Sequence, residues 1–256
     1  PITVRWVETN KGDDQCPKIR SRLVAREIRL KGEEAIFAPT PPLESLRMAL
    51  SHATTRFPGE PETIWDAERP ARQMIVFMDI SRAYFNANLD EGAKTCVQLP
   101  PEDPDAGVLC AELLRHMYGA RAAADGWQDE YSSTLVSELG FVQGVASPCL
   151  FRHSSRAILV SVHGDDFTTV GPIHDLDWLE AQMQEHYELT IQPRIGPGPQ
   201  DAKDAVILHR TICCALSFIH IWRCRRSTQV EYRQPLNSSI QHLPILHPTR
   251  ILALSY

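Results

Sequence analysis

Five consecutive apolar residues, Met74–Met78, lead directly into Asp79. An apolar run of this length without polar alternation indicates a central strand that is buried on both faces of a sheet. The carboxylate of Asp79 then stands at the end of a buried element, where an isolated charge is costly. Divalent metal ions would remove that cost, and the simpler alternative is that Asp79 caps a following helix.

A second acidic position lies in a predicted hairpin. Two strand-like runs, Ala157–Val162 and Phe167–Val170, flank the segment His163–Asp166, so Asp165 and Asp166 are expected at the hairpin tip. Carboxylates from two neighbouring strands that converge on one edge of a sheet are able to bind two Mg²⁺ ions roughly 3.5–4 Å apart. The alternative is ordinary turn chemistry, because Gly-Asp-Asp is common in turns.

The remaining periodicity predicts an α+β fold. The expected elements are strands over Ile2–Val7, Lys18–Arg26 and Leu189–Gln192, and helices over 42–55, 122–139 and 174–187. Residues 56–72, which are rich in proline and glycine, are expected to form a loop. From about residue 213 onward the sequence shows neither a helical nor a strand period.

The composition suits a globular protein whose middle segment of sequence is acidic. The 256 residues carry a net charge of −6, divided into +2 over 1–50, −13 over 51–208 and +5 over 209–256. This distribution does not point to nucleic-acid binding, which uses clustered Lys and Arg, but it suits carboxylates that bind divalent cations. No apolar run reaches the ~20 residues of a membrane-spanning helix. Seven cysteines without paired spacing indicate reduced thiols in an intracellular protein, and the start without Met suggests an internal piece of a longer chain.

An aromatic residue follows Asp79 on the expected strand-to-helix junction. Tyr84 comes five residues after Asp79. A ring in this place is able to lie against the sugar of an incoming nucleotide and exclude a 2′-hydroxyl, which selects deoxynucleotides. The alternative is that Tyr84 and Phe85 are core residues.

Several separate stretches occur in the order typical of one family. They are Arg20–Arg26, Phe37–Thr40 with the following Leu46–Leu50 helix, Asp79–Phe85, Tyr118–Trp127, Leu139–Phe141, Ser147–Phe151 and the Asp165-Asp166 hairpin. Over about residues 3–212 the chain resembles the reverse transcriptase domain of the Pol polyprotein of copia-type LTR retrotransposons. Each motif is weak alone, and their shared order makes the resemblance specific.

The resemblance implies an RNA-directed DNA polymerase, a nucleotidyltransferase with a right-hand fold in which an antiparallel sheet is backed by helices. Residues 1–212 would form the fingers and palm, with fingers over about 1–73 and the palm over about 74–195. Residues 213–256 would be a tail outside the family, disordered or foreign in origin.

The same resemblance implies roles for individual residues. The catalytic and metal-binding triad would be Asp79, Asp165 and Asp166. The nucleotide-binding residues would be Arg22 and Arg26, whose guanidinium groups suit triphosphate oxygens, the sugar gate Tyr84, and Arg121.

The resemblance also implies cofactors and partners. The cofactor would be two Mg²⁺ ions, with Mn²⁺ as an alternative. The partners would be an RNA template, a DNA primer–template duplex and deoxynucleoside triphosphates. No membrane is implied, and the location would be intracellular, in a cytoplasmic virus-like particle or the nucleus. The sequence does not set an oligomeric state.

The chain departs from the family pattern at two motifs. His163-Gly164 stands where the family has an aromatic and an aliphatic residue, and Arg121–Ala124 stands where it has Lys-Gln followed by Ala-Pro. No thumb or ribonuclease H region is recognisable. Two alternatives therefore stay open. One is a catalytically inactive retroelement remnant or nucleic-acid-binding module. The other is an unrelated metal-dependent phosphotransferase, which would not explain Tyr84, Arg22 and Arg26 together.

Overall fold

The computed structural model describes most of the chain up to residue 223. The described residues are 1–13, 15–28, 41, 43–54, 73–89, 92, 94–196, 198–208, 210–215 and 218–223. They lie in one compact unit, Pro1–Cys224, and the second unit, Arg225–Tyr256, falls outside them. The expected loop over 56–72 and the motif at Phe37–Thr40 also lie outside the described residues.

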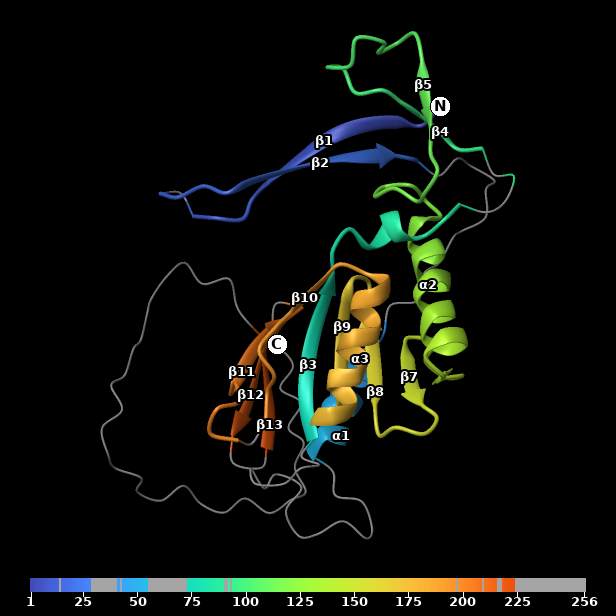
Figure 1. Ribbon diagram of the computed structural model, residues 1–256. Coiled ribbons are helices and arrows are strands. Elements are labelled where there is room, and N and C mark those ends of the chain that lie inside the picture. Colours follow the sequence, from blue (N-terminus) through green and yellow to red (C-terminus); the bar gives the residue numbers. More distant parts are fainter. Residues whose placement is uncertain are drawn as a thin grey trace. The chain divides into compact units, whose positions relative to one another are not determined.

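A six-stranded antiparallel sheet with the order β10-β3-β9-β8-β7-β6 lies at the centre (Figure 1). Its strands are β3 (Gln73–Ile80), β6 (Phe141–Gln143), β7 (Leu150–His153), β8 (Leu159–His163), β9 (Asp166–Pro172) and β10 (Leu189–Ile191). The expected antiparallel sheet with helices packed on it is confirmed.

Helices α2 (Ala123–Ser133) and α3 (Ile173–His186) cover one face of this sheet. Side chains alternate along a strand, so Met74, Val76 and Met78 of β3 all point to this face. The helix residues that pack against them include Trp127, Tyr131, Leu176, Leu179 and Met183. The apolar run is therefore buried on this side by two helices.

Helix α1 (Leu43–Thr54) covers the opposite face, where Ile75 and Phe77 are buried with Leu46 and Leu50. A smaller three-stranded sheet extends the same apolar cluster. Its strands are β11 (Asp204–Ile207), β12 (Arg210–Ala215) and β13 (Phe218–Arg223), and it contributes the buried residues Ile207 and Ile212. Burial on both faces thus explains why β3 has no polar alternation.

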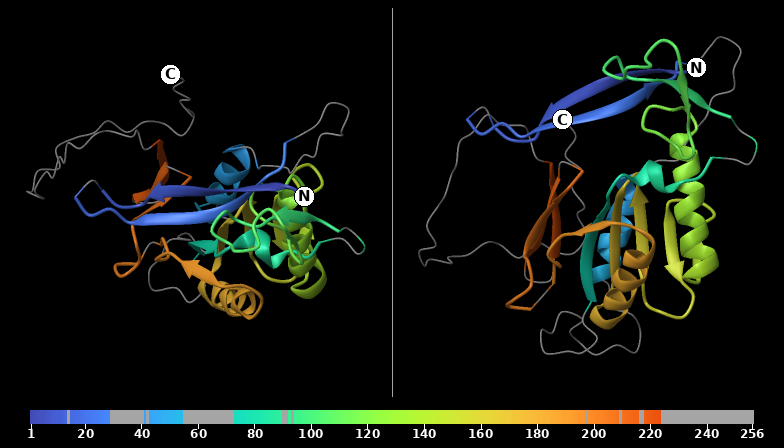
Figure 2. Two further views of the ribbon diagram at one scale, coloured as in Figure 1. Left: turned by 90° about the horizontal axis from the view of Figure 1, so that it is seen from above. Right: turned by 45° about the horizontal axis from the view of Figure 1, so that its top comes forward.

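The N-terminal hairpin is formed by β1 (Thr3–Asn10) and β2 (Ile19–Arg26), and Figure 2 shows it crossing over the end of the sheet at which β3 ends. It docks on the segment before α2, where the Ala25 amide donates to the Tyr118 carbonyl at 2.7 Å. Gly119 has φ +88°, and a Cβ there would lie 1.9 Å from the Ala25 carbonyl oxygen. Only glycine permits this close approach.

A further hairpin of β4 (Cys96–Gln98) and β5 (Cys110–Glu112) lies beside the N-terminal one. The Ile2 amide donates to the Cys96 carbonyl at 2.7 Å, and the Gln98 amide donates to the Ile2 carbonyl at 2.8 Å. A small apolar cluster of Ala25, Val97 and Met117 closes the contact.

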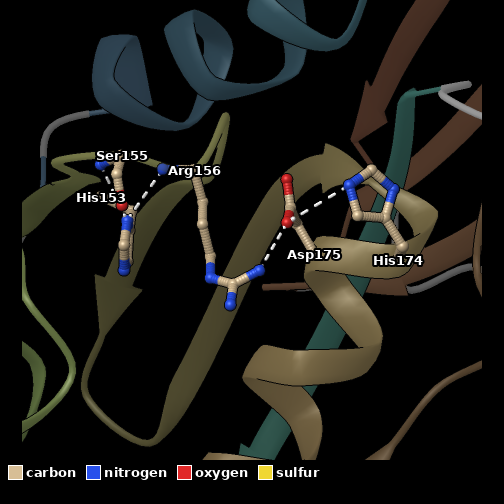
Figure 3. Close-up of polar contacts among 5 residues, drawn as sticks. All are labelled: His153, Ser155, Arg156, His174 and Asp175. Carbon is tan, nitrogen blue, oxygen red and sulfur yellow. Dashed lines mark hydrogen bonds and ion pairs between the residues drawn. The ribbon is translucent and has the colours of Figure 1, made fainter.

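A polar network fastens the connection between β7 and β8 to the start of α3 (Figure 3). Nδ1 of His153 accepts the backbone N–H groups of Ser155 and Arg156 at 3.1 and 2.9 Å. The Arg156 guanidinium pairs with the buried Asp175 carboxylate at 2.8 Å and lies 4.1 Å from the centre of the Trp178 ring. Asp175 is thereby a buried charge with a cationic partner, as burial requires.

Two local expectations differ from the structure. The helix expected over 122–139 is α-helical only to Ser133 and continues as a π-helical turn, Thr134–Glu138, before Gly140 ends it with φ +76°. Residues 213–223, where the sequence shows no strand period, lie partly in strands, because β12 pairs with β13. Whether the family domain ends near 212 stays a prediction. Within the described residues, no helix has the length and apolar character needed to cross a membrane.

Candidate active site

Asp79 and Asp166 lie side by side at one end of the central sheet. Asp79 is the next-to-last residue of β3, Asp166 is the first residue of β9, and the two are directly opposed across this strand pair. Opposed residues on neighbouring antiparallel strands project their side chains from the same face of the sheet. Both side chains are partly buried. The structure thus brings together two of the three predicted catalytic carboxylates.

Asp165 lies in the tight turn between β8 and β9, where the Ile80 amide donates to its backbone carbonyl at 3.0 Å. Gly164, with φ +65°, forms the other half of the turn. Its carbonyl accepts the indole N–H of Trp127 at 2.8 Å. The buried Trp127 of α2 therefore anchors the hairpin tip to the helix layer, in addition to its place in the core.

The three carboxylates act on one another electrostatically. Burial and the charge of Asp165 raise the pKa of Asp79, whereas Arg20, Arg22 and Lys11 act in the opposite direction. Burial, and then the charges of Asp165 and Asp79, raise the pKa of Asp166 to about 6. Burial is the larger cause of both shifts and the neighbouring carboxylates add to it, so both effects disfavour the ionised carboxylates. The site therefore favours the arrival of a cation.

The donor set fits a hard divalent cation chemically, because Mg²⁺ and Mn²⁺ prefer carboxylate oxygens. In the described part of the chain, no three His, Cys, Asp or Glu side chains are already grouped around a common point as metal ligands. The fit therefore rests on the chemistry of the three carboxylates and on the raised pKa values of Asp79 and Asp166.

Tyr84 lies in a short 3₁₀ helix, Ala83–Asn86, that follows β3. Its ring centre is 4.5 Å from that of Tyr118, and the two planes are inclined by 43°. Burial and the charge of Asp165 raise the pKa of Tyr84, so its hydroxyl group lies within electrostatic reach of the acidic cluster. Tyr84 packs partly against the core and is partly exposed, so it is not solely a core residue.

The predicted arginines of β2 occupy different surroundings. The guanidinium of Arg22 lies 5.4 Å from the centre of the Tyr118 ring, and its charge acts on Asp79. Arg26 is exposed and lies on the same face of the hairpin as Arg22, because the two are four residues apart in one strand. Arg121 is held through its backbone N–H, which donates to the Glu27 carboxylate at 2.7 Å. The charge of Arg22 thus lowers the pKa of Asp79, whereas Arg26 is not among the groups that act on this carboxyl.

Two further residues join the site. Tyr118 connects Arg22 to Tyr84, and burial together with Asp165 raises the pKa of its hydroxyl. Arg20 adds a second cation that acts on Asp79. The spacing of Arg20 and Arg22 was a usable signal, because residues two apart in a strand share a face. Tyr118 begins one of the family motifs, but its contacts with Arg22 and Tyr84 join distant segments and could not be predicted from local spacing.

Comparisons with known proteins identify a family and a solved structure with partial similarity. The model of a family described as reverse transcriptase (RNA-dependent DNA polymerase) matches residues 1–195. Among solved structures, apo telomerase from Candida tropicalis, truncated from its C-terminal domain, is similar with a TM-score of 0.43 and 10% sequence identity. That match covers 86% of this chain and 55% of the telomerase chain. No match was found among curated proteins.

Proposed function

The chain belongs to the reverse transcriptase (RNA-dependent DNA polymerase) family, and from this premise we propose that it is the fingers and palm of a copia-type retrotransposon polymerase. In this proposal the fingers cover about residues 1–73 and the palm covers about 74–195. The reaction is the attack of a primer 3′-hydroxyl on the α-phosphate of a deoxynucleoside triphosphate, with pyrophosphate as the leaving group.

The observation that carries the proposal is that Asp79, Asp165 and Asp166 all lie at the same end of the sheet. Asp79 and Asp166 are opposed across neighbouring strands, and Asp165 accepts a backbone hydrogen bond from the residue after Asp79. About 85 residues separate the two strands in sequence, so this juxtaposition depends on the fold. The raised pKa values of Asp79 and Asp166 support a cation-binding role.

Each residue has a separate task in the proposed reaction. Asp79, Asp165 and Asp166 hold two divalent ions, Mg²⁺ with Mn²⁺ as the alternative. When bound, such ions lower the pKa of an attacking hydroxyl and stabilise charge on the transferred phosphoryl group. Arg22 and Arg26 bind triphosphate oxygens through their guanidinium groups, with Arg121 as a further contact. The ring of Tyr84 excludes a ribose 2′-hydroxyl from the sugar position.

The proposed partners follow from this reaction. They are an RNA template, a DNA primer–template duplex and deoxynucleoside triphosphates, within a cytoplasmic virus-like particle or the nucleus. The cations of the N-terminal hairpin that act on Asp79, namely Arg20, Arg22 and Lys11, provide positive charge for phosphate groups. They also explain how an acidic chain is able to approach a polyanion locally.

A catalytically inactive retroelement remnant that binds nucleic acid is the second candidate. It is favoured by the lack of a preformed metal-ligand group among the described residues and by His163-Gly164 in the catalytic hairpin. The two candidates differ in whether primer extension occurs at all.

The deciding experiment is primer extension on an RNA template by the full chain, with and without Mg²⁺. Asp165→Asn should lower incorporation by more than about a hundred-fold, since even residues one shell beyond the metal ligands cost 10–100-fold. The matched control is Glu44→Gln, which removes an exposed carboxylate on α1. Equal incorporation by the variant and the parent would remove the catalytic claim. No incorporation by the parent, with retained binding of the primer–template duplex, would favour the remnant.

A further inference from the structure

The backbone between Asp79 and Tyr84 turns through an unfavourable conformation at Arg82. This residue has φ 54° and ψ 40°, the left-handed region that residues with a Cβ rarely adopt. Glycine or asparagine is the usual choice in such a position. An arginine here indicates that the side chain has a task which compensates for the strain.

The side chain of Arg82 pairs with Glu188, the residue that directly precedes β10. The same Glu188 also holds the preceding residue of the turn, because its backbone carbonyl accepts the Ser81 amide at 2.9 Å. Leu189, the next residue, is opposed to Ile80 of β3. Glu188 therefore holds the turn through two interactions. Its backbone carbonyl accepts the Ser81 amide, and its carboxylate pairs with the Arg82 guanidinium.

The turn passes this constraint on to the 3₁₀ helix that carries Tyr84. The carbonyl of Arg82 accepts the Phe85 amide at 2.9 Å and the Asn86 side-chain amide at 3.4 Å. Tyr84 lies in the chain between Arg82 and these two donor residues. Its ring packs on Tyr118 with a centre-to-centre distance of 4.5 Å. A rotation of the turn at Arg82 would therefore move the ring of Tyr84 relative to Tyr118 and Asp165.

The pair contributes little to global stability. The side chains of Arg82 and Glu188 are 69% and 65% exposed, and exposed ion pairs are generally weak. Its effect is therefore local to the turn between the first catalytic carboxylate and the proposed sugar gate.

We propose that Arg82 and Glu188 are positioning residues that fix the ring of Tyr84 and thereby sharpen the discrimination between deoxyribose and ribose. This inference rests on the proposed function, in which Tyr84 excludes the 2′-hydroxyl. In this proposal both residues act through the turn that carries Tyr84 and not through contact with the reacting atoms.

The test measures nucleotide binding without chemistry. The full chain is mixed with a primer–template duplex whose primer ends in a dideoxynucleotide, and binding of the triphosphate of 2-aminopurine deoxyriboside is compared with that of its riboside by fluorescence. Tyr84→Ala should abolish the preference for the deoxy form. Glu188→Gln should lower the preference by about five-fold, the upper range for an exposed pair. Arg82→Lys, which keeps the charge, should retain most of it.

Two further measurements separate positioning from folding. Glu44→Gln breaks the exposed Arg47–Glu44 pair on α1 and should leave the preference unchanged. Hydrogen exchange should become faster at the amides of Phe85 and Ala87 in Glu188→Gln, because these amides close the 3₁₀ helix.

The outcomes distinguish this inference from the function on which it rests. A parent chain that binds neither nucleotide, or both equally, contradicts the proposed function and the inference together. A parent preference that survives Glu188→Gln unchanged overturns the positioning role alone. Faster exchange at the turn without a change in preference would reduce the Arg82–Glu188 pair to a structural contact.

Discussion

Asp166 is held in surroundings that oppose its own ionisation. Burial and two neighbouring carboxylates raise its pKa to about 6, well above the value of 3.8 expected in an unfolded chain. Between these two values the folded state binds more protons than the unfolded state, so this group makes the protein less stable as the pH rises through that window. The full penalty is present above pH 6 in the metal-free protein. In the proposed function the Asp166 carboxylate holds a cation, so function and stability would oppose one another at this residue.

Replacing Asp166 by Asn should stabilise the metal-free fold. In the presence of EDTA at pH 8, we expect the free energy of unfolding of Asp166→Asn to rise by about 1 kcal/mol, which is less than the full pKa shift because the carboxyl is partly exposed. The gain should be smaller at pH 5, where Asp166 is largely protonated. Urea unfolding at the two pH values measures both. Glu185→Gln, at an exposed site on α3, is the control. An equal gain at both pH values would contradict this explanation.

At the level of single residues, sequence reasoning found those whose neighbours along the chain reveal them. Asp79 is marked by the apolar run before it, and Asp165 and Asp166 are marked by the flanking strands. Glu188 carries no such mark, and Tyr118 is marked only as the start of a family motif, which does not reveal its contacts. Tyr118 matters because it joins Arg22 to Tyr84, and Glu188 matters because it reaches Arg82, 106 residues away. Contacts of this range follow from the tertiary fold and are invisible in local spacing.

At the level of elements, the connection from β7 to β8 depends on a neutral histidine. Nδ1 of His153 accepts two backbone N–H groups, and only the unprotonated nitrogen has the lone pair to do so. Burial, and then the charge of Arg156, lower the pKa of His153 below its ordinary value of 6.5. A hydrogen bond to the backbone of Leu139 and the charge of Asp175 act in the opposite direction. The unfolded state therefore binds more protons just below pH 6.5, and stability is lost as the pH falls through this region.

A neutral substitute for His153 should remove this acid sensitivity. His153→Asn keeps a side-chain oxygen that is able to accept the Ser155 and Arg156 amides. We expect its stability to change less than that of the parent between pH 7.5 and pH 5.5, measured by urea unfolding. His153→Ala should also lose the pH dependence, but it should be less stable at both pH values by about 1 kcal/mol because the two amides lose their acceptor. A parental pH dependence in His153→Asn would exclude His153 as its source.

Long elements with clear periodicity were predictable, and of the three-residue strands only β10 was predicted. The strand at β3 and the helices α1 and α3 follow apolar patterns that extend over five residues or more. Strands β4, β5 and β6 have three residues each, too few to show alternation. Strand β13 has no sequence period that marks it, and it exists because its backbone pairs with β12. Tertiary pairing here overrides weak local preference.

At the level of the whole molecule, the described chain is organised around one sheet buried on both faces. One face belongs to α2 and α3, and the other is shared by α1 and the small sheet of β11–β13. The family match ends at residue 195, before β11 begins. The small sheet nevertheless contributes Ile207 and Ile212 to the cluster that covers Ile75 and Phe77. The folded core thus extends beyond the residues that identify the family.

Truncation should show where the folded unit ends. Removing residues 224–256 should leave the melting temperature within a few degrees of the parent, because the cluster that includes Ile207 and Ile212 lies before this point. Ending the chain at 195 removes both isoleucines, each worth roughly 1.5–3 kcal/mol when fully buried. Their sum of roughly 3–6 kcal/mol is comparable with the lower end of the 5–15 kcal/mol that stabilises a typical domain.

The shorter chain ending at 195 should therefore unfold or aggregate, as calorimetry and size-exclusion chromatography would show. A chain ending at 215 keeps Ile207, Ile212 and the whole of β12 but loses β13, the partner of β12. Its melting temperature should lie between those of the chains ending at 223 and at 195, because β12 then becomes an edge strand with unpaired amides. If the chain ending at 195 melts like the parent, the sheet of β11–β13 is an appendage, and the face of β3 beside α1 is covered without it.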